Sequence, residues 1–103
     1  MKADYVTMAT SSESEGTWLQ GTIATTYDKL VETFGEPNGS PREMETAYVA
    51  KTNSLWILKF PDGTIATIYD WKLKNTPTDL YDWHIGGHNK KAVGAVLSAV
   101  YLR

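Results

Sequence analysis

The chain contains no cysteine. This absence excludes disulfide bonds, zinc–thiolate sites and catalysis by a thiol. No apolar run approaches the roughly 18 residues that a membrane-spanning helix needs, and the first residues lack the apolar stretch of a secretory signal. We therefore expect no membrane partner and a cytoplasmic location.

Neither sign of charge is in large excess. The net charge of −2 is too small to indicate a generic nucleic-acid binder or a DNA mimic. Residues 1–52 carry eight acidic and four basic side chains, whereas residues 53–103 carry four acidic and six basic ones. The basic excess in the second half indicates a face for an anion or an acidic partner, although a solvated surface with scattered charges would give the same count.

Aromatic residues, by contrast, are abundant. The 103 residues are 42% hydrophobic and include four Trp and six Tyr, which is enough for one domain with a buried core. The stretch from Thr10 to Gly16 is small, polar and acidic, with no aromatic side chain to anchor it. We therefore expect residues 1–16 to form a flexible N-terminal arm and residues 17–103 to form a single domain.

Two segments have the apolar spacing of amphipathic helices. The first begins at Thr25 as its N-cap and ends at Gly35, a C-cap glycine that Pro37 follows. The second begins after Asn89 as its cap and runs to the C-terminus. Each has one apolar face, which consists of Tyr27, Leu30, Val31 and Phe34 in the first helix and of Val93, Val96, Leu97, Val100 and Tyr101 in the second.

The clearest β signal is a hairpin over residues 55–71, with Pro61-Asp62-Gly63 as its turn. Pairing of Phe60 with Thr64 would divide its side chains between two faces. The core face then carries Trp56, Leu58, Phe60, Ala66 and Ile68. The other face carries Leu55, Ile57, Ile65, Tyr69 and Trp71, and it is so apolar that the arm and a helix, or a partner, must cover it.

Shorter strands are predicted over residues 17–23, 44–51 and 81–85, and the pair Gly86-Gly87 is expected to break the last of them. The predicted fold is a small single α+β domain. It has a three- to four-stranded antiparallel sheet and two helices.

The segment from Trp83 to Lys91 is the strongest candidate for a binding site. A glycine pair that leads into a helix N-terminus presents unpaired N–H groups to an anion. Lys90 and Lys91 in the first helical turn oppose the helix dipole, as a phosphate or carboxylate site would require. Nearby aromatic side chains would stack on a base. The candidate residues are Tyr69, Trp71, Trp83, His84, Gly86, Gly87, His88, Lys90 and Lys91.

A plainer interpretation of the same segment stays open. The glycine pair would then be a tight strand-to-helix turn, with the lysines paired to Asp79 and Asp82. His84 and His88 have the spacing of a helical metal pair, but the glycines between them oppose a helix, so we expect ordinary surface histidines and no metal. No nucleophile motif is present. We expect no cofactor and no enzymatic activity, with a hydrolase using a His–Asp base as the alternative.

Three segments of the chain together resemble small, uncharacterised proteins of tailed bacteriophages. They are Tyr27–Pro37, Trp56–Trp71 and Trp83–Gly87. The resemblance implies a protein in the cytoplasm of an infected bacterial host that acts by binding, blocking a host enzyme or a host defence complex, for example as an anti-CRISPR.

The contact surface expected for such an inhibitor combines an apolar sheet face with a basic loop. The sheet face carries Leu55, Ile57, Tyr69 and Trp71, and the loop carries His84, His88, Lys90 and Lys91. One alternative is a protein that sequesters a nucleotide or another small anion at Gly86-Gly87, with a homodimer formed through the sheet face. Another is the small histidine-dependent hydrolase.

Overall fold

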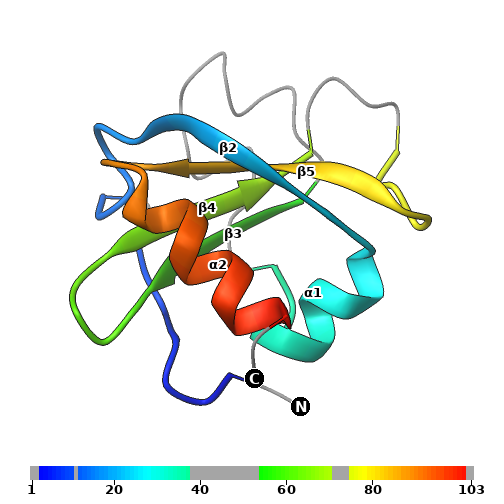
Figure 1. The fold of residues 1–103 in the computed structure, drawn as a ribbon, viewed down its shortest axis with the longest axis horizontal. Helices are drawn as coiled ribbons and strands as arrows, with labels where there is room; N and C mark the ends of the chain where they lie inside the picture. The colour runs from blue at the N-terminus through cyan, green and yellow to red at the C-terminus, as the bar shows by residue number, and fades with distance from the viewer. Residues whose placement is uncertain (1–2, 11, 38–53, 71–74, 102–103) are drawn as a thin grey trace.

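The computed structural model describes residues 3–10, 12–37, 54–70 and 75–101. Their strands form one antiparallel sheet in the order β1-β3-β4-β5-β2. The elements along the chain are β1 (Thr7–Met8), β2 (Trp18–Thr25), α1 (Tyr27–Phe34), β3 (Leu55–Lys59), β4 (Ile65–Tyr69), β5 (Tyr81–Gly87) and α2 (Lys91–Tyr101) (Figure 1). The α+β class is confirmed. The sheet has five strands rather than three to four, and the strand predicted over 44–51 lies outside the described residues.

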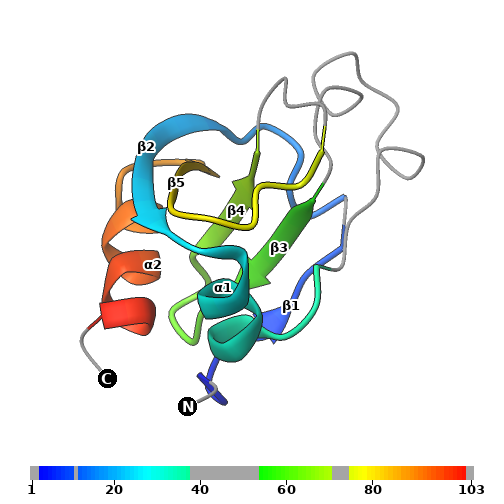
Figure 2. The ribbon, with the colours of Figure 1, turned by 90° about the vertical axis from the view of Figure 1, so that its right-hand side faces the viewer.

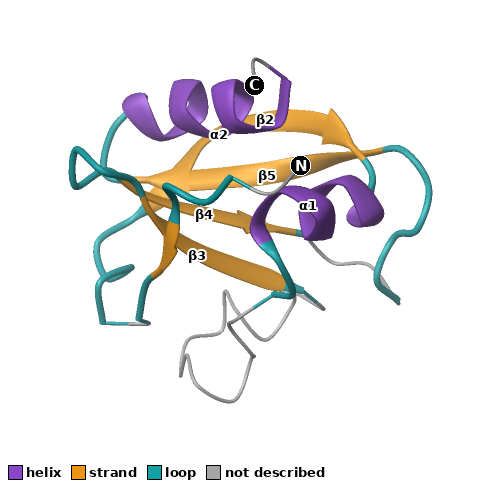
Figure 3. Cartoon of the chain, turned by 90° about the horizontal axis from the view of Figure 1, so that it is seen from below, coloured by secondary structure: helices purple, strands orange, loops and turns teal. Residues whose placement is uncertain are grey.

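Both helices lie on the same side of the sheet, as Figures 2 and 3 show. The predicted core face of the hairpin is confirmed, because its five apolar side chains all belong to the main hydrophobic cluster. Trp56 and Trp83 are fully buried at its centre, with ring centroids 5.5 Å apart and nearly perpendicular planes. Such an edge-to-face pair contributes beyond its buried area.

The hairpin has the register that the sequence predicts. The Phe60 N–H donates to the Thr64 carbonyl at 2.9 Å, and Lys59 pairs with Ile65. Gly63 has a φ of +89°, the left-handed conformation that only glycine adopts without strain. The turn residues therefore determine which side chains of β3 and β4 face the helices.

Helix α1 begins one residue later than expected. Its N-cap is Thr26, whose hydroxyl accepts from the Lys29 N–H at 3.1 Å. Thr25, the predicted cap, is instead the last residue of β2 and pairs with Tyr81. The predicted end is confirmed, because Gly35 adopts a φ of +87° and its N–H donates to the Val31 carbonyl at 2.8 Å.

Helix α2 has the predicted cap, since the Asn89 side chain accepts from the Lys91 N–H at 2.9 Å. Its buried stripe is offset from the predicted face, however. Tyr101 is exposed, and the fully buried residues are Ala92, Val96, Ala99 and Val100. Two of these buried residues are alanines, because the helix packs closely on β4 and β5 and leaves little room for larger side chains.

The expectation that Gly86-Gly87 breaks the last strand is wrong. Both glycines lie inside β5, where Gly86 pairs with Leu19 and Thr67, and Gly87 pairs with Trp18 and Ala66. A Cβ on Gly86 would collide with the Thr67 hydroxyl, and one on Gly87 with the Ala92 methyl group. The glycines therefore allow β4 and α2 to pack closely against β5, and they do not form a loop.

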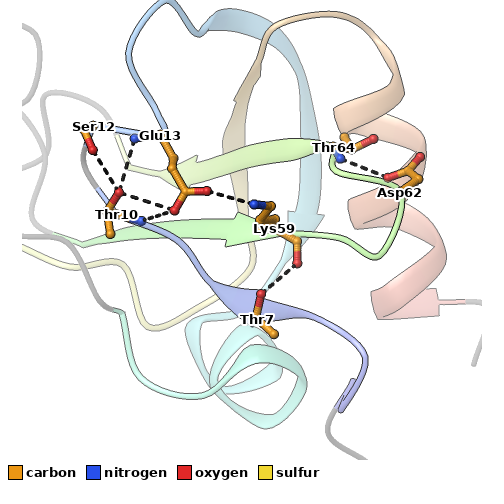
Figure 4. A network of polar contacts seen from close by, with 7 residues as sticks. All are labelled: Thr7, Thr10, Ser12, Glu13, Lys59, Asp62 and Thr64. Atoms are coloured by element: carbon orange, nitrogen blue, oxygen red, sulfur yellow. Dashed lines mark hydrogen bonds and ion pairs between the residues drawn. The ribbon is translucent and has the colours of Figure 1, made fainter.

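Residues 3–16, expected as an arm, make specific contacts where they are described. The Ala3 N–H donates to the Thr33 carbonyl at 2.8 Å, and β1 pairs with β3. Thr10 and Glu13 exchange side-chain-to-backbone hydrogen bonds of 3.2 and 3.3 Å, the reciprocal arrangement of a capping box. The Glu13 carboxylate also pairs with Lys59 at 3.2 Å (Figure 4). Hydrogen bonds from Thr10, supplemented by Lys59, lower the pKa of Glu13.

Candidate functional site

The two predicted aromatic binding residues that the structure describes, Tyr69 and Trp83, are buried. Trp83 is 0% exposed, and its indole N–H donates to the Thr25 carbonyl at 3.2 Å. Tyr69 is 2% exposed and stacks on His84 with ring centroids 5.4 Å apart. Neither ring is available to stack on a nucleotide base, which corrects the expectation of an aromatic platform. Trp71 lies outside the described residues.

The sheet face opposite the helices is likewise not a bare apolar contact surface. Leu55, Ile57 and Tyr69 are each no more than 3% exposed. They form a second hydrophobic cluster with Ile65 and with Ala9. The Ala9 N–H donates to the Ile57 carbonyl at 2.9 Å, so the N-terminal segment lies beside β3, and Glu13 pairs with Lys59, which alternates onto the same face as Leu55 and Ile57. The expected docking surface is therefore occupied from within the chain at these residues.

The basic residues of the β5–α2 turn remain at the surface. His88, Lys90 and Lys91 are all exposed. Beside them, a cleft of about 220 Å³ separates this turn from the β3–β4 turn. The residues that line it are Asp62, Gly63, Thr64, Ile65, His88, Asn89 and Lys91.

The cleft has balanced charge rather than the excess of positive charge expected of an anion site. The Asp62 carboxylate accepts from the Thr64 N–H at 3.0 Å. Hydrogen bonds from Thr64, supplemented by the Lys91 cation, lower the pKa of Asp62 and keep it ionised. Lys90 does not line the cleft, since its ammonium donates to the Gln20 carbonyl at 3.2 Å. The N–H groups of Lys91, Ala92 and Val93 at the start of α2 all have acceptors within the chain, so they are not presented to an anion as the predicted glycine-loop site requires.

Trp18 is a surface residue that the sequence reasoning did not select. It begins β2, pairs with Gly87 and is 56% exposed. This pairing places it beside the β5–α2 turn. We call the group Trp18, His88, Lys90 and Lys91 the basic corner.

The basic corner is built by two segments that are distant in sequence, residues 16–20 and the β5–α2 turn. A Cβ at Gly16 would lie 3.6 Å from the His88 ring, so the turn that precedes β2 contacts this histidine. The Gln20 side chain donates to the Gly87 carbonyl at 3.1 Å, while Lys90 bonds back to the Gln20 carbonyl. These reciprocal contacts hold the start of β2 against the turn, so the corner presents an aromatic ring and three basic side chains from one well-connected region.

His84 lies apart from the basic corner, on the sheet face opposite the helices. Its Nδ1 atom is buried and has no hydrogen-bond partner among the described residues. Burial lowers the pKa of His84, although the charges of Asp70 and Asp82 act in the opposite direction. No group of three His, Cys, Asp or Glu side chains suited to a metal ion occurs among the residues that the structure describes.

We expect His84 to make folding sensitive to mild acid. Since burial depresses its pKa in the folded state, the unfolded chain binds more protons below the ordinary value of 6.5. The free energy of unfolding should fall as the pH drops below 6.5 and level off below the folded-state pKa. His84→Gln should remove this part of the slope in urea denaturation curves measured over a pH series. The exposed His88→Gln variant is the control, and a slope lost there but kept in His84→Gln would contradict the assignment.

Comparison of the chain with protein-family models, curated proteins and solved structures finds no match. Within the described ranges, no helix has both the length and the apolar character needed to cross a membrane.

Proposed function

We propose that this protein is a non-enzymatic binding protein that contacts another protein through the basic corner. The observation that carries the proposal is Trp18, a 56% exposed tryptophan at the start of a strand. Tryptophan and cationic side chains that gather on one surface are typical of interface hot spots. Here Trp18 pairs with Gly87, the residue before His88 on the β5–α2 turn.

The charge of the corner indicates the chemistry of the partner. His88, Lys90 and Lys91 favour an acidic protein surface, and such complementarity raises association rates and orients the encounter. The resemblance to small phage proteins supports a target in the infected host, either an enzyme or a defence complex such as a CRISPR effector. Inhibition would then follow from occupancy of the target surface, with no chemical step.

The proposal predicts that Trp18→Ala weakens binding to the host target by tenfold or more, because tenfold corresponds to about 1.4 kcal/mol and a hot-spot residue contributes about 2 kcal/mol or more. The target would first be identified by affinity capture from host lysate and then purified, and its Kd would be measured by surface plasmon resonance.

Leu80→Ala is the matched control because Leu80 is 72% exposed and lies before β5, away from the corner. It should leave the Kd unchanged. Equal losses in the two variants, or an unchanged Kd for Trp18→Ala, would exclude the corner as the contact surface.

A further inference from the structure

Strand β2 is a long edge of the sheet. Among the described strands, it pairs only with β5, so one side of its eight-residue backbone has no strand alongside. The opposite edge, β1, contains only two residues. Unpaired edges are templates for pairing with another chain, and proteins usually protect them by short length, charge or proline.

Most of those protective devices are missing from β2. Its sequence, Trp18 to Thr25, contains neither a charged residue nor a proline. Thr22 and Ala24, which are exposed, are small enough to let a second backbone approach. A bulge between Leu19 and Gly21 interrupts the ladder near one end only.

The two ends of α2 reach the β2 backbone with side-chain donors. Lys90 donates to the Gln20 carbonyl, and the Tyr101 hydroxyl donates to the Ala24 carbonyl. Both donors belong to exposed side chains. They cover parts of the edge without blocking it as a strand or a proline would.

Charge is distributed unevenly along this edge. Lys90 lies at its beginning, next to Gln20. Beyond its end, Asp28 lies in the first turn of α1, and the exposed Asp82 lies one strand further in, on β5 opposite Ala24. The strand between these ends is uncharged. An antiparallel arrangement of two such edges brings each basic end to the acidic end of the other copy, whereas a parallel arrangement brings like charges together.

We infer that the protein forms a two-fold symmetric homodimer in which the β2 edges of two copies pair antiparallel. The two sheets would become one continuous sheet, with the Lys90 end of each β2 beside the acidic end of the other. This contact is self-complementary and closed, and the two-residue β1 edge offers little for further growth. The paired edge shares Trp18 and Lys90 with the basic corner, so the inference is tested at Thr22, which is not part of the corner.

The test uses Thr22, which lies next to the midpoint of β2. In an antiparallel pairing of whole strands, Thr22 lies close to its own copy across the two-fold axis. Thr22→Lys therefore places two like charges together, as Thr22→Glu does, and each should weaken dimerisation by about tenfold or more. Sedimentation velocity over a concentration series of the full chain would measure the Kd. Thr78→Lys, an exposed site away from the edge, controls for the added charge and should leave the Kd unchanged.

Mixing the two Thr22 variants provides the decisive measurement. Lysine on one copy and glutamate on the other should restore a dimer of twice the 11.5 kDa chain mass, detected as the mixed species by native mass spectrometry. A wild-type chain that stays monomeric at every concentration would overturn the inference. A dimer that neither variant weakens, or one that the mixture does not restore, would also overturn it. If Thr22→Lys fails to fold, Asp82→Lys at the acidic end should weaken the same contact.

Discussion

Trp83→Ala is expected to lower the free energy of unfolding by about 3–5 kcal/mol, as is typical when a fully buried tryptophan is removed. The Trp83 ring is 0% exposed and meets Trp56 and Tyr81 edge-on, with centroids 5.5 and 5.4 Å away. Its indole N–H is the donor to the Thr25 carbonyl at the end of β2. The substitution would remove packing at the point where sheet and helices meet, and urea or guanidinium denaturation would measure the loss.

Trp83→Phe separates the packing of this residue from its hydrogen bond. Phenylalanine keeps an aromatic ring but leaves the Thr25 carbonyl without its donor. We expect the missing hydrogen bond to lower the free energy of unfolding by about 1–3 kcal/mol, in addition to the effect of the smaller ring. The opposing hypothesis places Trp83 at the surface as a platform for a base. Under that hypothesis even the alanine variant would stay within about 0.5 kcal/mol of wild type, because surface substitutions seldom do more.

The parts of the fold that could be predicted from the sequence are those determined by neighbouring residues. The turn Pro61-Asp62-Gly63 sets the register of the hairpin, and Gly35 ends α1. Each is a local conformational preference that does not depend on the rest of the chain. The faces of β3 and β4 followed correctly from the register because side chains alternate along a strand.

The role of Gly86-Gly87 could not be predicted in the same way. A glycine pair is compatible with a loop and with close packing, and only its neighbours distinguish the two. Those neighbours are Thr67 on β4 and Ala92 on α2, and only the folded chain places them there. The strand count was low for a related reason, because β1 is two residues long and gains its pairing from β3.

The candidate site was partly predictable. His88, Lys90 and Lys91 were selected from their position before a helix, and they do lie together at the surface. Trp18 was missed because its place beside them depends on the register between β2 and β5. The contacts of the N-terminal segment could have been predicted, because Thr10-Ser11-Ser12-Glu13 has the sequence pattern of a capping box. That pattern would have placed structure where an arm was expected.

Gly87→Ala is expected to lower the free energy of unfolding by about 3 kcal/mol, the upper part of the range for overpacking a core. The added Cβ would collide with the Ala92 methyl group and approach two carbonyl oxygens, of Ile65 at 3.2 Å and of Asn89 at 3.3 Å. Because backbone atoms take part, a change of side-chain rotamer cannot relieve the crowding. Gly94→Ala is the control within α2, since a Cβ there meets nothing within 4 Å. It should raise the free energy of unfolding by about 0.5–1 kcal/mol through helix propensity.

Pairing Gly87→Ala with Ala92→Gly identifies the cause of the loss. Ala92→Gly alone should lower the free energy of unfolding by about 1 kcal/mol because glycine is a poor helix former. The loss of the buried Ala92 methyl group should add to this decrease. In the double variant the collision with that methyl group is absent, so the loss should be smaller than the sum of the two single losses. Strict additivity would mean that the strand, rather than its contact with α2, resists the side chain. A Gly87→Ala variant as stable as wild type would instead indicate that β5 ends before Gly87, as a strand-breaking glycine pair would require.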